Sequence, residues 1–154
     1  MTVATKARER HIARPVSKQR LRLWLRLLRS SRAIEAQLRE RLRANFAITL
    51  PQFDVMATLA RHQHGITMTE LSRQLMVSNG NVTGIIDRLA VEKLVLRQAP
   101  ATDRRSFIVR LTPKGMAQFS TMAKAHENWV DKLLVEIDAP EAESMIERLD
   151  RLVK

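Results

Sequence analysis

The sequence has 154 residues and a net charge of +11, and it contains no cysteine. The lack of cysteine excludes disulfides, thiol redox chemistry and cysteine-ligated metal sites. Four glycines, five prolines and 45% apolar residues indicate a mostly helical chain that can bury a core. No apolar run approaches the roughly 20 residues that span a bilayer, and the basic N-terminus lacks the apolar stretch of a signal peptide. We therefore expect a cytoplasmic protein.

Basic charge is concentrated in two parts of the chain. Residues 1–44 contain 13 Lys or Arg and 3 Asp or Glu, a net charge of +10. Residues 61–110 contain 8 basic and 4 acidic residues, a net charge of +4. Such surfaces attract polyanions, of which nucleic acid is the usual one. An anionic membrane and an acidic small molecule remain alternatives.

The N-terminal part of the sequence predicts an arm followed by a long helix. Residues 1–17 are basic and lack periodicity, which predicts a flexible arm. Within residues 18–48, apolar residues recur at mostly three- and four-residue spacing, which predicts an amphipathic helix of about 28 residues. These apolar residues are Leu21, Trp24, Leu28, Ile34, Leu38 and Leu42. A helix of this length is hard to bury in one small domain, so we predict a dimerisation helix that packs against a partner chain.

Capping signals predict three shorter helices in the next part. Residues 49–52 (Thr-Leu-Pro-Gln) form a capping box with proline in the first turn, before a helix that ends near residue 64. Residues 67–70 (Thr-Met-Thr-Glu) form a second box, before a short helix that ends at residue 75. Residues 78–81 (Ser-Asn-Gly-Asn) begin a helix that ends near residue 93.

The pattern then changes from helical spacing to strands. The pattern predicts two strands, at residues 95–98 and 107–111, which are joined by a polar turn. Two helices follow, at about 112–135 and from 138 to the C-terminus. We therefore assign 49–111 to one compact lobe and 112–154 to C-terminal dimerisation helices.

The middle of the chain has the order of a DNA-binding motif. Residues 67–93 form a short helix, a three-residue turn and a second helix that begins with small polar residues, and a two-stranded ribbon follows. Base edges are read by short hydrogen-bonding side chains at the start of a recognition helix. Gly84 costs about 1 kcal/mol relative to alanine in a helix interior, which either close approach to DNA or tight helix packing would explain. The fold class expected is mainly α with a small β wing, a winged helix-turn-helix with a helical dimerisation stem.

The sequence contains four short motifs, at residues 69–72 (Thr-Glu-Leu-Ser), 82–89 (Val-Thr-Gly-Ile-Ile-Asp-Arg-Leu), 103–105 (Asp-Arg-Arg) and 111–115 (Leu-Thr-Pro-Lys-Gly). In this order and spacing they resemble the MarR family of bacterial regulators. The resemblance implies a homodimer built from the first and the last two helices, with two winged lobes on a pseudo-palindromic operator in double-stranded DNA. It implies a regulator, commonly a repressor, that a small aromatic ligand releases from DNA. The family's oxidation sensors use a cysteine in the first helix, and this sequence has none.

The resemblance also assigns DNA-contacting roles to residues. It implies that Asn79, Asn81 and Thr83 face bases, and that Thr69, Arg73 and Ser78 contact phosphates. Arg105, with Arg104, lies at the ribbon tip, where an arginine can enter a narrow minor groove, and Asp103 could hold Arg105 in position. Arg88 would either pair with Asp87 or Glu92 within its helix or reach a phosphate.

The effector would bind in the family's pocket between the first, second and fifth helices. The candidate ligand-binding residues are Arg22, Trp24, Arg26, Leu28, Phe53, Met56, Met116 and Phe119. Two alternatives to ligand binding remain open. The apolar candidates could be ordinary core residues, which is usual for apolar residues at helical spacing. The arginines could form a solvated face of the helix, which is usual for arginines on a helix. Residues 68–89 resemble the branch of the family that governs aromatic-acid breakdown, which implies an aromatic acid or its coenzyme A thioester as ligand.

Other functions have less support in the sequence. It contains no nucleophile elbow, no phosphate-binding glycine loop and no cysteine nucleophile, so we expect no enzyme and no cofactor. His62 and His64 are the only histidines at close spacing, and we expect no metal site. The alternative function is a basic helical protein that binds RNA or membranes, but 4% aromatic residues are few for stacking on RNA bases, and no membrane partner is expected.

Overall fold

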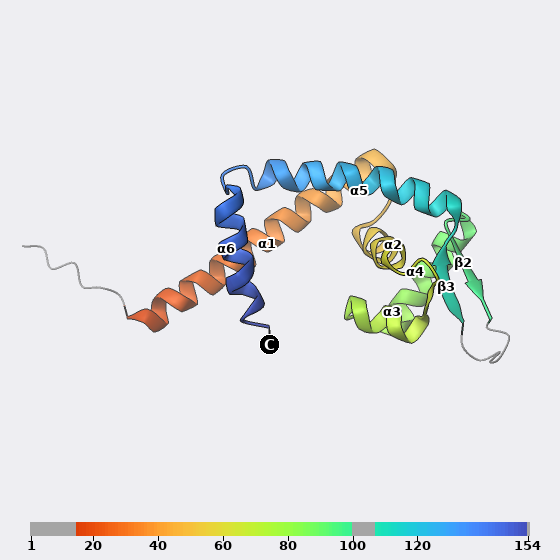
Figure 1. Cartoon of the computed structure of the whole chain (residues 1–154), viewed down its shortest axis with the longest axis horizontal. Helices are drawn as coiled ribbons and strands as arrows, with labels where there is room; N and C mark the ends of the chain where they lie inside the picture. The colour runs from red at the N-terminus through yellow and green to blue at the C-terminus, as the bar shows by residue number, and fades with distance from the viewer. Residues whose placement is uncertain (1–14, 100–106, 154) are drawn as a thin grey trace, which may run out of the picture. The chain divides into compact units, whose positions relative to one another are not determined.

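The structure is a computed structural model that describes residues 15–99 and 107–153 (Figure 1). The chain forms two compact units, one ending at Glu35 and the other beginning at Ala36, and each is described by itself. Helix α1, Val16–Phe46, has 31 residues, so it begins within the segment expected to be an arm. Residues 1–14, the rest of that segment, lie outside the described residues.

Side-chain caps fix the start of the next three helices. Helix α2, Leu50–Arg61, begins with the predicted box, in which the Gln52 backbone N–H donates to the Thr49 hydroxyl (3.3 Å) and the Thr49 N–H donates to Gln52 Oε1 (2.9 Å). Helices α3, Met68–Leu75, and α4, Asn79–Val91, begin after the N-caps Thr67 and Ser78. These hydroxyls satisfy backbone donors that have no partner in the first turn of a helix.

The sheet has one strand more than the sequence predicts. Strands β2, Val95–Gln98, and β3, Ile108–Leu111, pair antiparallel as expected. A third strand, β1, Ile66–Thr67, pairs antiparallel with the other edge of β3, so the order is β1-β3-β2. The expectation of a two-stranded ribbon was therefore incomplete, because two residues are too few to show an alternating pattern.

Two helices complete the chain. Helix α5, Pro113–Leu133, follows the N-cap Thr112, and helix α6, Ala139–Asp150, follows a capping box made by Asp138 and Glu141. The Thr112 hydroxyl lies 2.8 Å from the carbonyl oxygen of Lys93 and 2.9 Å from the N–H of Gly115. This hydroxyl therefore joins the residues before β2 to the first turn of α5.

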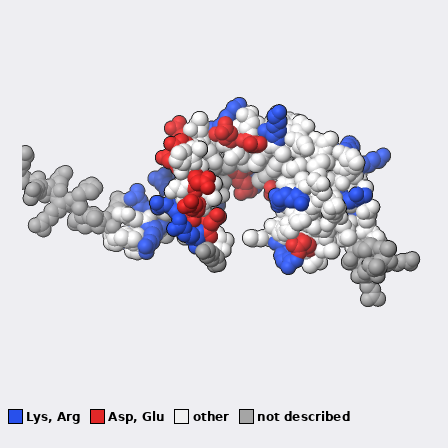
Figure 2. All heavy atoms as spheres, viewed as in Figure 1, with Lys and Arg blue, Asp and Glu red and all other residues white. Residues whose placement is uncertain are grey.

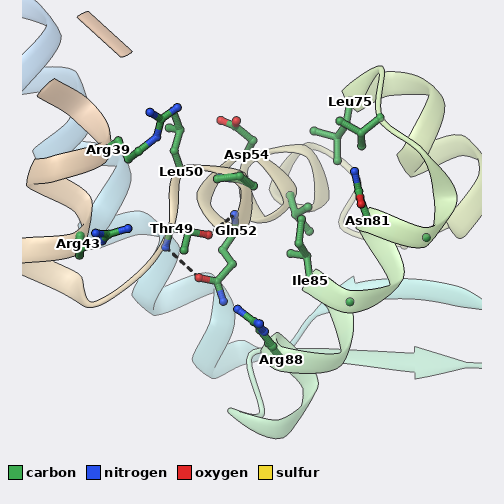
Figure 3. Close-up of a pocket in the computed structure, with 15 residues that line it drawn as sticks. Arg39, Arg43, Thr49, Leu50, Gln52, Asp54, Leu75, Asn81, Ile85 and Arg88 are labelled. Atoms are coloured by element: carbon green, nitrogen blue, oxygen red, sulfur yellow. Dashed lines mark hydrogen bonds between the residues drawn. The ribbon is translucent and has the colours of Figure 1, made fainter. Parts of the chain in front are cut away.

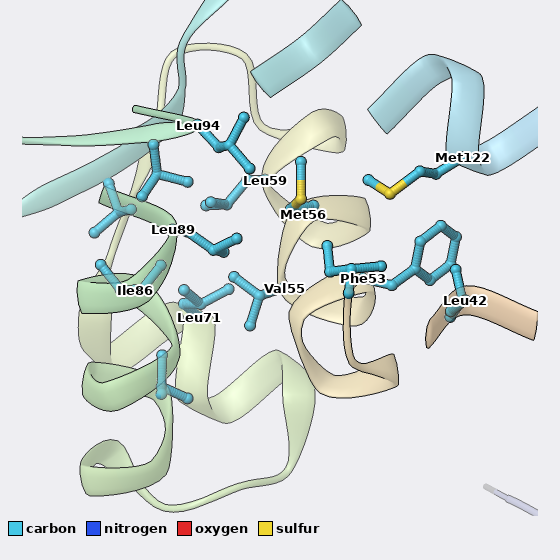
Figure 4. Close-up of a cluster of buried hydrophobic side chains, with 14 residues drawn as sticks. Leu42, Phe53, Val55, Met56, Leu59, Leu71, Ile86, Leu89, Leu94 and Met122 are labelled. Carbon is cyan, nitrogen blue, oxygen red and sulfur yellow. The ribbon is translucent and has the colours of Figure 1, made fainter. Parts of the chain in front are cut away.

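The core of the second unit lies between α2, α3, α4 and the sheet (Figure 4). Helix α4 buries Val82, Ile86 and Leu89, whereas Ile85 is partly buried. The buried apolar side chains of this cluster are Leu42, Ile48, Phe53, Val55, Met56, Leu59, Leu71, Val82, Ile86, Leu89, Leu94, Val95, Val109 and Met122. Burial of this cluster fixes the orientation of α4, because one face of the helix is committed to the core.

Candidate nucleic-acid interface

A tight turn places α4 directly after α3. Met76 adopts a left-handed conformation with φ 53°, which ends α3. Ser78 then caps α4, and its hydroxyl accepts a hydrogen bond from the backbone N–H of Asn81 at 3.4 Å. The three-residue turn predicted from the sequence is thus residues 76–78. It exposes the N-terminal end of α4, whose backbone N–H groups favour an anion such as a phosphate.

The outward face of α4 is polar and has little bulk. Asn81, Thr83 and Arg88 are exposed, whereas the side chain of Asn79 lies outside the described part of the structure. Apart from the chain neighbours and the adjacent backbone of α4 itself, no heavy atom of the described residues lies within 4 Å of a Cβ built on Gly84, and the same holds for Gly80. Tight packing among the described residues therefore does not explain Gly84.

An ion pair connects α4 to the sheet. Asp87 of α4 pairs with Arg97 of β2 (2.5 Å), so the recognition helix is connected to the wing. Within the described residues, Arg88 forms neither of the ion pairs with Asp87 or Glu92 that we considered for it. Arg97 could not be predicted from sequence spacing, because its partner Asp87 lies ten residues away on another element.

Helix α3 presents the candidate phosphate contacts. Thr69 and Arg73 are exposed, and Arg73 pairs with Glu70. Glu70 also accepts a hydrogen bond from Gln74 (2.9 Å), and Gln74 Oε1 lies 3.1 Å from His62 Nε2. The predicted capping box is only partly formed. The backbone N–H of Glu70 donates to the Thr67 hydroxyl, but the Glu70 side chain makes the contacts above instead of accepting from the backbone of Thr67. The candidates Arg104 and Arg105, with Asp103, lie outside the described residues.

A cavity of about 680 Å³ lies between the C-terminal part of α1 and α4, over the N-terminal end of α2 (Figure 3). We call it the α1–α4 cavity. Helix α1 contributes Arg39 and Arg43, and α4 contributes Gly80, Asn81, Gly84, Ile85 and Arg88. The rest of the lining is Thr49, Leu50, Pro51, Gln52, Asp54, Val55, Leu75 and Val77. None of the eight predicted ligand-binding residues lines this cavity.

The predicted ligand-binding residues have different environments. Phe53 and Met56 are buried in the core, and the ring of Phe53 lies 5.6 Å from that of Phe119. Met116 lines a separate hollow of about 300 Å³ beside Arg110. The other four, Arg22, Trp24, Arg26 and Leu28, belong to the first unit, where the Trp24 side chain is 56% exposed. Phe53 and Met56 are therefore core residues, which is the alternative that we considered for the apolar candidates.

Charge is unevenly distributed over the described surface. Figure 2 shows Lys and Arg side chains over the first part of α1, and Asp and Glu side chains over the end of α5 and over α6.

Within the described residues, no group of three or more His, Asp or Glu could hold a metal ion. No helix in the same residues is long and apolar enough to cross a membrane.

His126 of α5 is the titratable group whose protonation we expect to affect stability. Its ring stacks on Phe53 with the centroids 4.7 Å apart. Burial lowers the pKa of His126 from its usual value, and the nearby carboxylate of Asp54 opposes this shift. The folded state therefore favours the neutral ring, and its contribution to stability is present above about pH 6.5 and declines as the pH falls below it.

We predict that the His126→Phe variant, which keeps an aromatic ring on Phe53, loses part of this pH dependence. Urea unfolding between pH 7.5 and pH 5 should give a shallower decrease in unfolding free energy for the variant than for the parent. His62 and His64 are unchanged in both proteins, so their contributions cancel in the difference. Equal slopes would contradict the assignment.

The fold and the site together define a class of protein. A helix-turn-helix formed by α3 and α4, followed by the β2–β3 wing and flanked by α1 and α5, is a winged helix-turn-helix. The mainly α fold class predicted from the sequence is therefore confirmed.

Comparison with known proteins identifies the family. The MarR family model matches residues 48–107. A MarR family transcriptional regulator of known structure from Silicibacter pomeroyi is 30% identical, with a TM-score of 0.74 over 89% of this chain and 94% of that chain. The transcriptional regulator MhqR from Bacillus subtilis is 23% identical over 137 residues, which are 89% of this chain and 93% of that protein. The chain belongs to the MarR family, as the sequence motifs implied.

A third comparison concerns the fold. A mutant of MarR from E. coli, solved in complex with operator DNA, has a TM-score of 0.77 and 23% identity over 91% of this chain and 99% of that chain. The relatives from Silicibacter pomeroyi and Bacillus subtilis are transcriptional regulators. The aromatic-acid branch of the family, which the sequence also resembles, remains a proposal.

Proposed function

We propose that this protein is a transcriptional repressor that binds double-stranded operator DNA as a homodimer and is released by a small aromatic effector. The observation that carries the proposal is the exposed face of α4, which is polar, carries Gly80 and Gly84 and is presented by a three-residue turn. A helix with small polar residues at its start can reach base edges in the major groove. A protein with this function would act in the cytoplasm.

Each element has a proposed role on DNA. Asn79, Asn81 and Thr83 would read base edges, and Arg104 and Arg105 would enter the minor groove. Thr69, Arg73 and Ser78 would contact phosphates, and Arg88 would reach a phosphate as well. Residues 49–111 would form the DNA-binding lobe, with 1–17 as a basic arm. The complex of the E. coli relative with operator DNA supports this arrangement, because its fold is the same.

We predict a homodimer formed by residues 18–48 and 112–154. Large apolar side chains are exposed in α1 and in the C-terminal segment, among them Leu21, Leu25, Ile146 and Leu152 at 40% exposure or more. Soluble monomers rarely expose large contiguous apolar patches. Sedimentation equilibrium at micromolar concentration should give twice the 17.7 kDa chain mass. A single species at the mass of one chain would contradict the prediction.

Binding to duplex DNA tests the function directly. Fluorescence anisotropy should detect tight binding to a duplex that contains an inverted repeat with half-sites about one helical turn apart. Matched RNA and vesicles of anionic lipid at physiological salt serve as comparators. Tighter binding to RNA or to vesicles than to any duplex would favour the alternative function. A footprint over one short asymmetric site would contradict the dimeric arrangement.

The recognition helix and the wing should respond differently to mutation. Asn81→Ala should lower the preference for one base position by about 1–3 kcal/mol, because a base-edge contact is lost. Arg105→Ala should weaken binding to all sequences alike, because readout in the minor groove depends on charge and width. Affinities for an operator and for single-base variants of it measure both effects. If both variants bound like the parent, the DNA-reading surface would lie elsewhere.

An aromatic acid or its coenzyme A thioester is the proposed effector. The support is chemical: arginines on α1 can hold a carboxylate or phosphates, and apolar side chains can hold a ring. The candidates that carry this proposal are Arg22, Trp24, Arg26, Leu28, Met116 and Phe119, whereas Phe53 and Met56 are core residues. A 100-fold loss of operator affinity requires about 2.7 kcal/mol of coupling. By reciprocity, operator DNA must weaken ligand binding by the same factor.

A further inference from the structure

We infer that the hollow beside Arg110 binds a small organic acid with one carboxylate and a body no larger than a single ring. We call this hollow the Arg110 site. It is formed by the end of α2 and the residues after it (Leu59 and Gln63), by β3 (Arg110 and Leu111) and by the first turn of α5 (Pro113 and Met116). It shares no residue with the α1–α4 cavity, and the inference does not depend on the proposed function.

The guanidinium of Arg110 contains a buried donor that lacks a partner. Its Nε atom is buried and has no hydrogen-bond partner within the described residues. In the same residues, Arg110 forms no ion pair. Arginine keeps its charge in proteins, and a charged donor that loses water without gaining an acceptor destabilises the folded state. A ligand oxygen that accepts from Arg110 would remove this cost.

The polar groups of the Arg110 site favour a carboxylate. The described lining includes no Asp or Glu, so no acidic side chain of the site competes for Arg110. The exposed amide of Gln63 makes no hydrogen bond within the described residues and can donate to a second ligand oxygen. The Thr112 hydroxyl also lines the hollow but already bonds to three backbone groups. A guanidinium and an amide together match the two oxygens of a carboxylate, through hydrogen bonds that the charges strengthen.

The apolar part of the lining sets the size of the ligand. Leu59, Leu111, Pro113 and Met116 supply apolar surface beside Arg110. The volume of about 300 Å³ is at the lower end of the roughly 300–1,000 Å³ range of ligand pockets, and an engineered cavity of about 150 Å³ is enough to bind benzene. A one-ring acid therefore fits, whereas a coenzyme A thioester does not. The thioether of Met116 suits a ring, because it is adaptable and polarisable.

An acid in the Arg110 site would contact α2, β3 and the first turn of α5 together. The site exists only when these elements are assembled, so the acid binds the folded state and raises the melting temperature of the protein as its concentration rises. This stabilisation can be measured without DNA.

Titration of benzoate into the full chain, followed by NMR of methyl-labelled methionine, tests the site directly. The signal of Met116 is identified by its loss in Met116→Leu. Benzoate should shift this signal and saturate at millimolar concentration or below, and uncharged benzamide should shift it less. The signal of Met145, an exposed residue of α6 outside the site, should not move. Sodium sulfate at equal ionic strength is the comparator for an inorganic anion.

Two variants separate the role of Arg110 from that of overall charge. Arg110→Gln should weaken benzoate binding by about tenfold or more, because charge-assisted hydrogen bonds are lost. It should also abolish the rise in melting temperature that benzoate causes. Arg148→Gln removes the same charge from an exposed position of α6 outside the site and should bind benzoate as the parent does.

Three results would overturn the inference. The first is that benzoate at millimolar concentration leaves the Met116 signal unmoved, even if it binds elsewhere. The second is that Arg110→Gln, with a melting curve as cooperative as that of the parent, binds benzoate as the parent does. The third is that sulfate or benzamide shifts Met116 as much as benzoate does. If Arg110→Gln failed to fold, the comparison of the three ligands on the parent would decide alone. Operator binding is measured separately, so a protein that binds benzoate here but no duplex DNA would contradict the proposed function and not this site.

Discussion

Raising the salt concentration from about 50 to about 200 mM should weaken operator binding by about 10³–10⁵-fold, because roughly 6–10 phosphates are neutralised per dimer. The chain carries a net charge of +11, and arginine is its main basic residue. Each arginine that contacts a phosphate releases a counterion from DNA, so the logarithm of affinity falls linearly with the logarithm of salt concentration. Anisotropy at four or five salt concentrations gives the slope.

A single-residue comparison sharpens this test. Arg73→Gln should reduce the slope by about one for each protomer, because Arg73 is a proposed phosphate contact. Arg148→Gln, on α6, should leave the slope unchanged although it removes the same charge. Equal changes in the two variants would show that net charge alone sets the salt dependence. A parent slope near zero would contradict operator binding through phosphates.

Gly115→Ala, at the first turn of α5, should be strongly destabilising. A Cβ on Gly115 would lie 1.9 Å from the carbonyl oxygen of Leu94. That oxygen belongs to the backbone, so the first turn of α5 would have to move away from the start of β2. We expect a loss of about 1–3 kcal/mol or more in unfolding free energy, as for other overpacked sites. Urea unfolding of the purified variant measures it.

Gly84→Ala is the matched control for this prediction. Gly84 has open space at its Cβ position, and alanine is favoured over glycine in a helix interior by about 1 kcal/mol. This variant should therefore be as stable as the parent or more so, although it adds a methyl group to the side of α4 that we propose faces DNA. Equal destabilisation by the two substitutions would show that the contact between Gly115 and Leu94 is not the cause.

Local signals predicted most of the fold. The starts of α2, α4 and α6 follow from Thr49, Ser78 and Asp138, because an N-cap acts on backbone groups two or three residues away. Strand β1 could not be predicted in this way. Its two residues pair with β3, about forty positions later, and only tertiary structure brings these segments together.

The candidate site was less predictable than the fold. The outward face of α4 follows from helical periodicity once Val82, Ile86 and Leu89 are placed in the core. The cavity does not, because Arg43 and Arg88 lie on different helices and no sequence spacing relates them. Apolar residues such as Phe53 and Met56 fit both a pocket and a core in the sequence, and the structure buries both.

The hydrogen bonds of the Thr112 hydroxyl couple the motion of two elements. It joins Lys93 and Leu94, which connect α4 to β2, to the first turn of α5, so we expect the base of the hairpin and α5 to turn together. Strand β2 has four residues, a lever of about 13 Å at roughly 3.3 Å per residue. A rotation of about 10° at this pivot would displace the far end of the strand by about 2 Å, which is several times the range of about 0.5 Å over which donor–acceptor distances in a hydrogen bond vary. A small tilt of α5 would therefore be amplified at the wing.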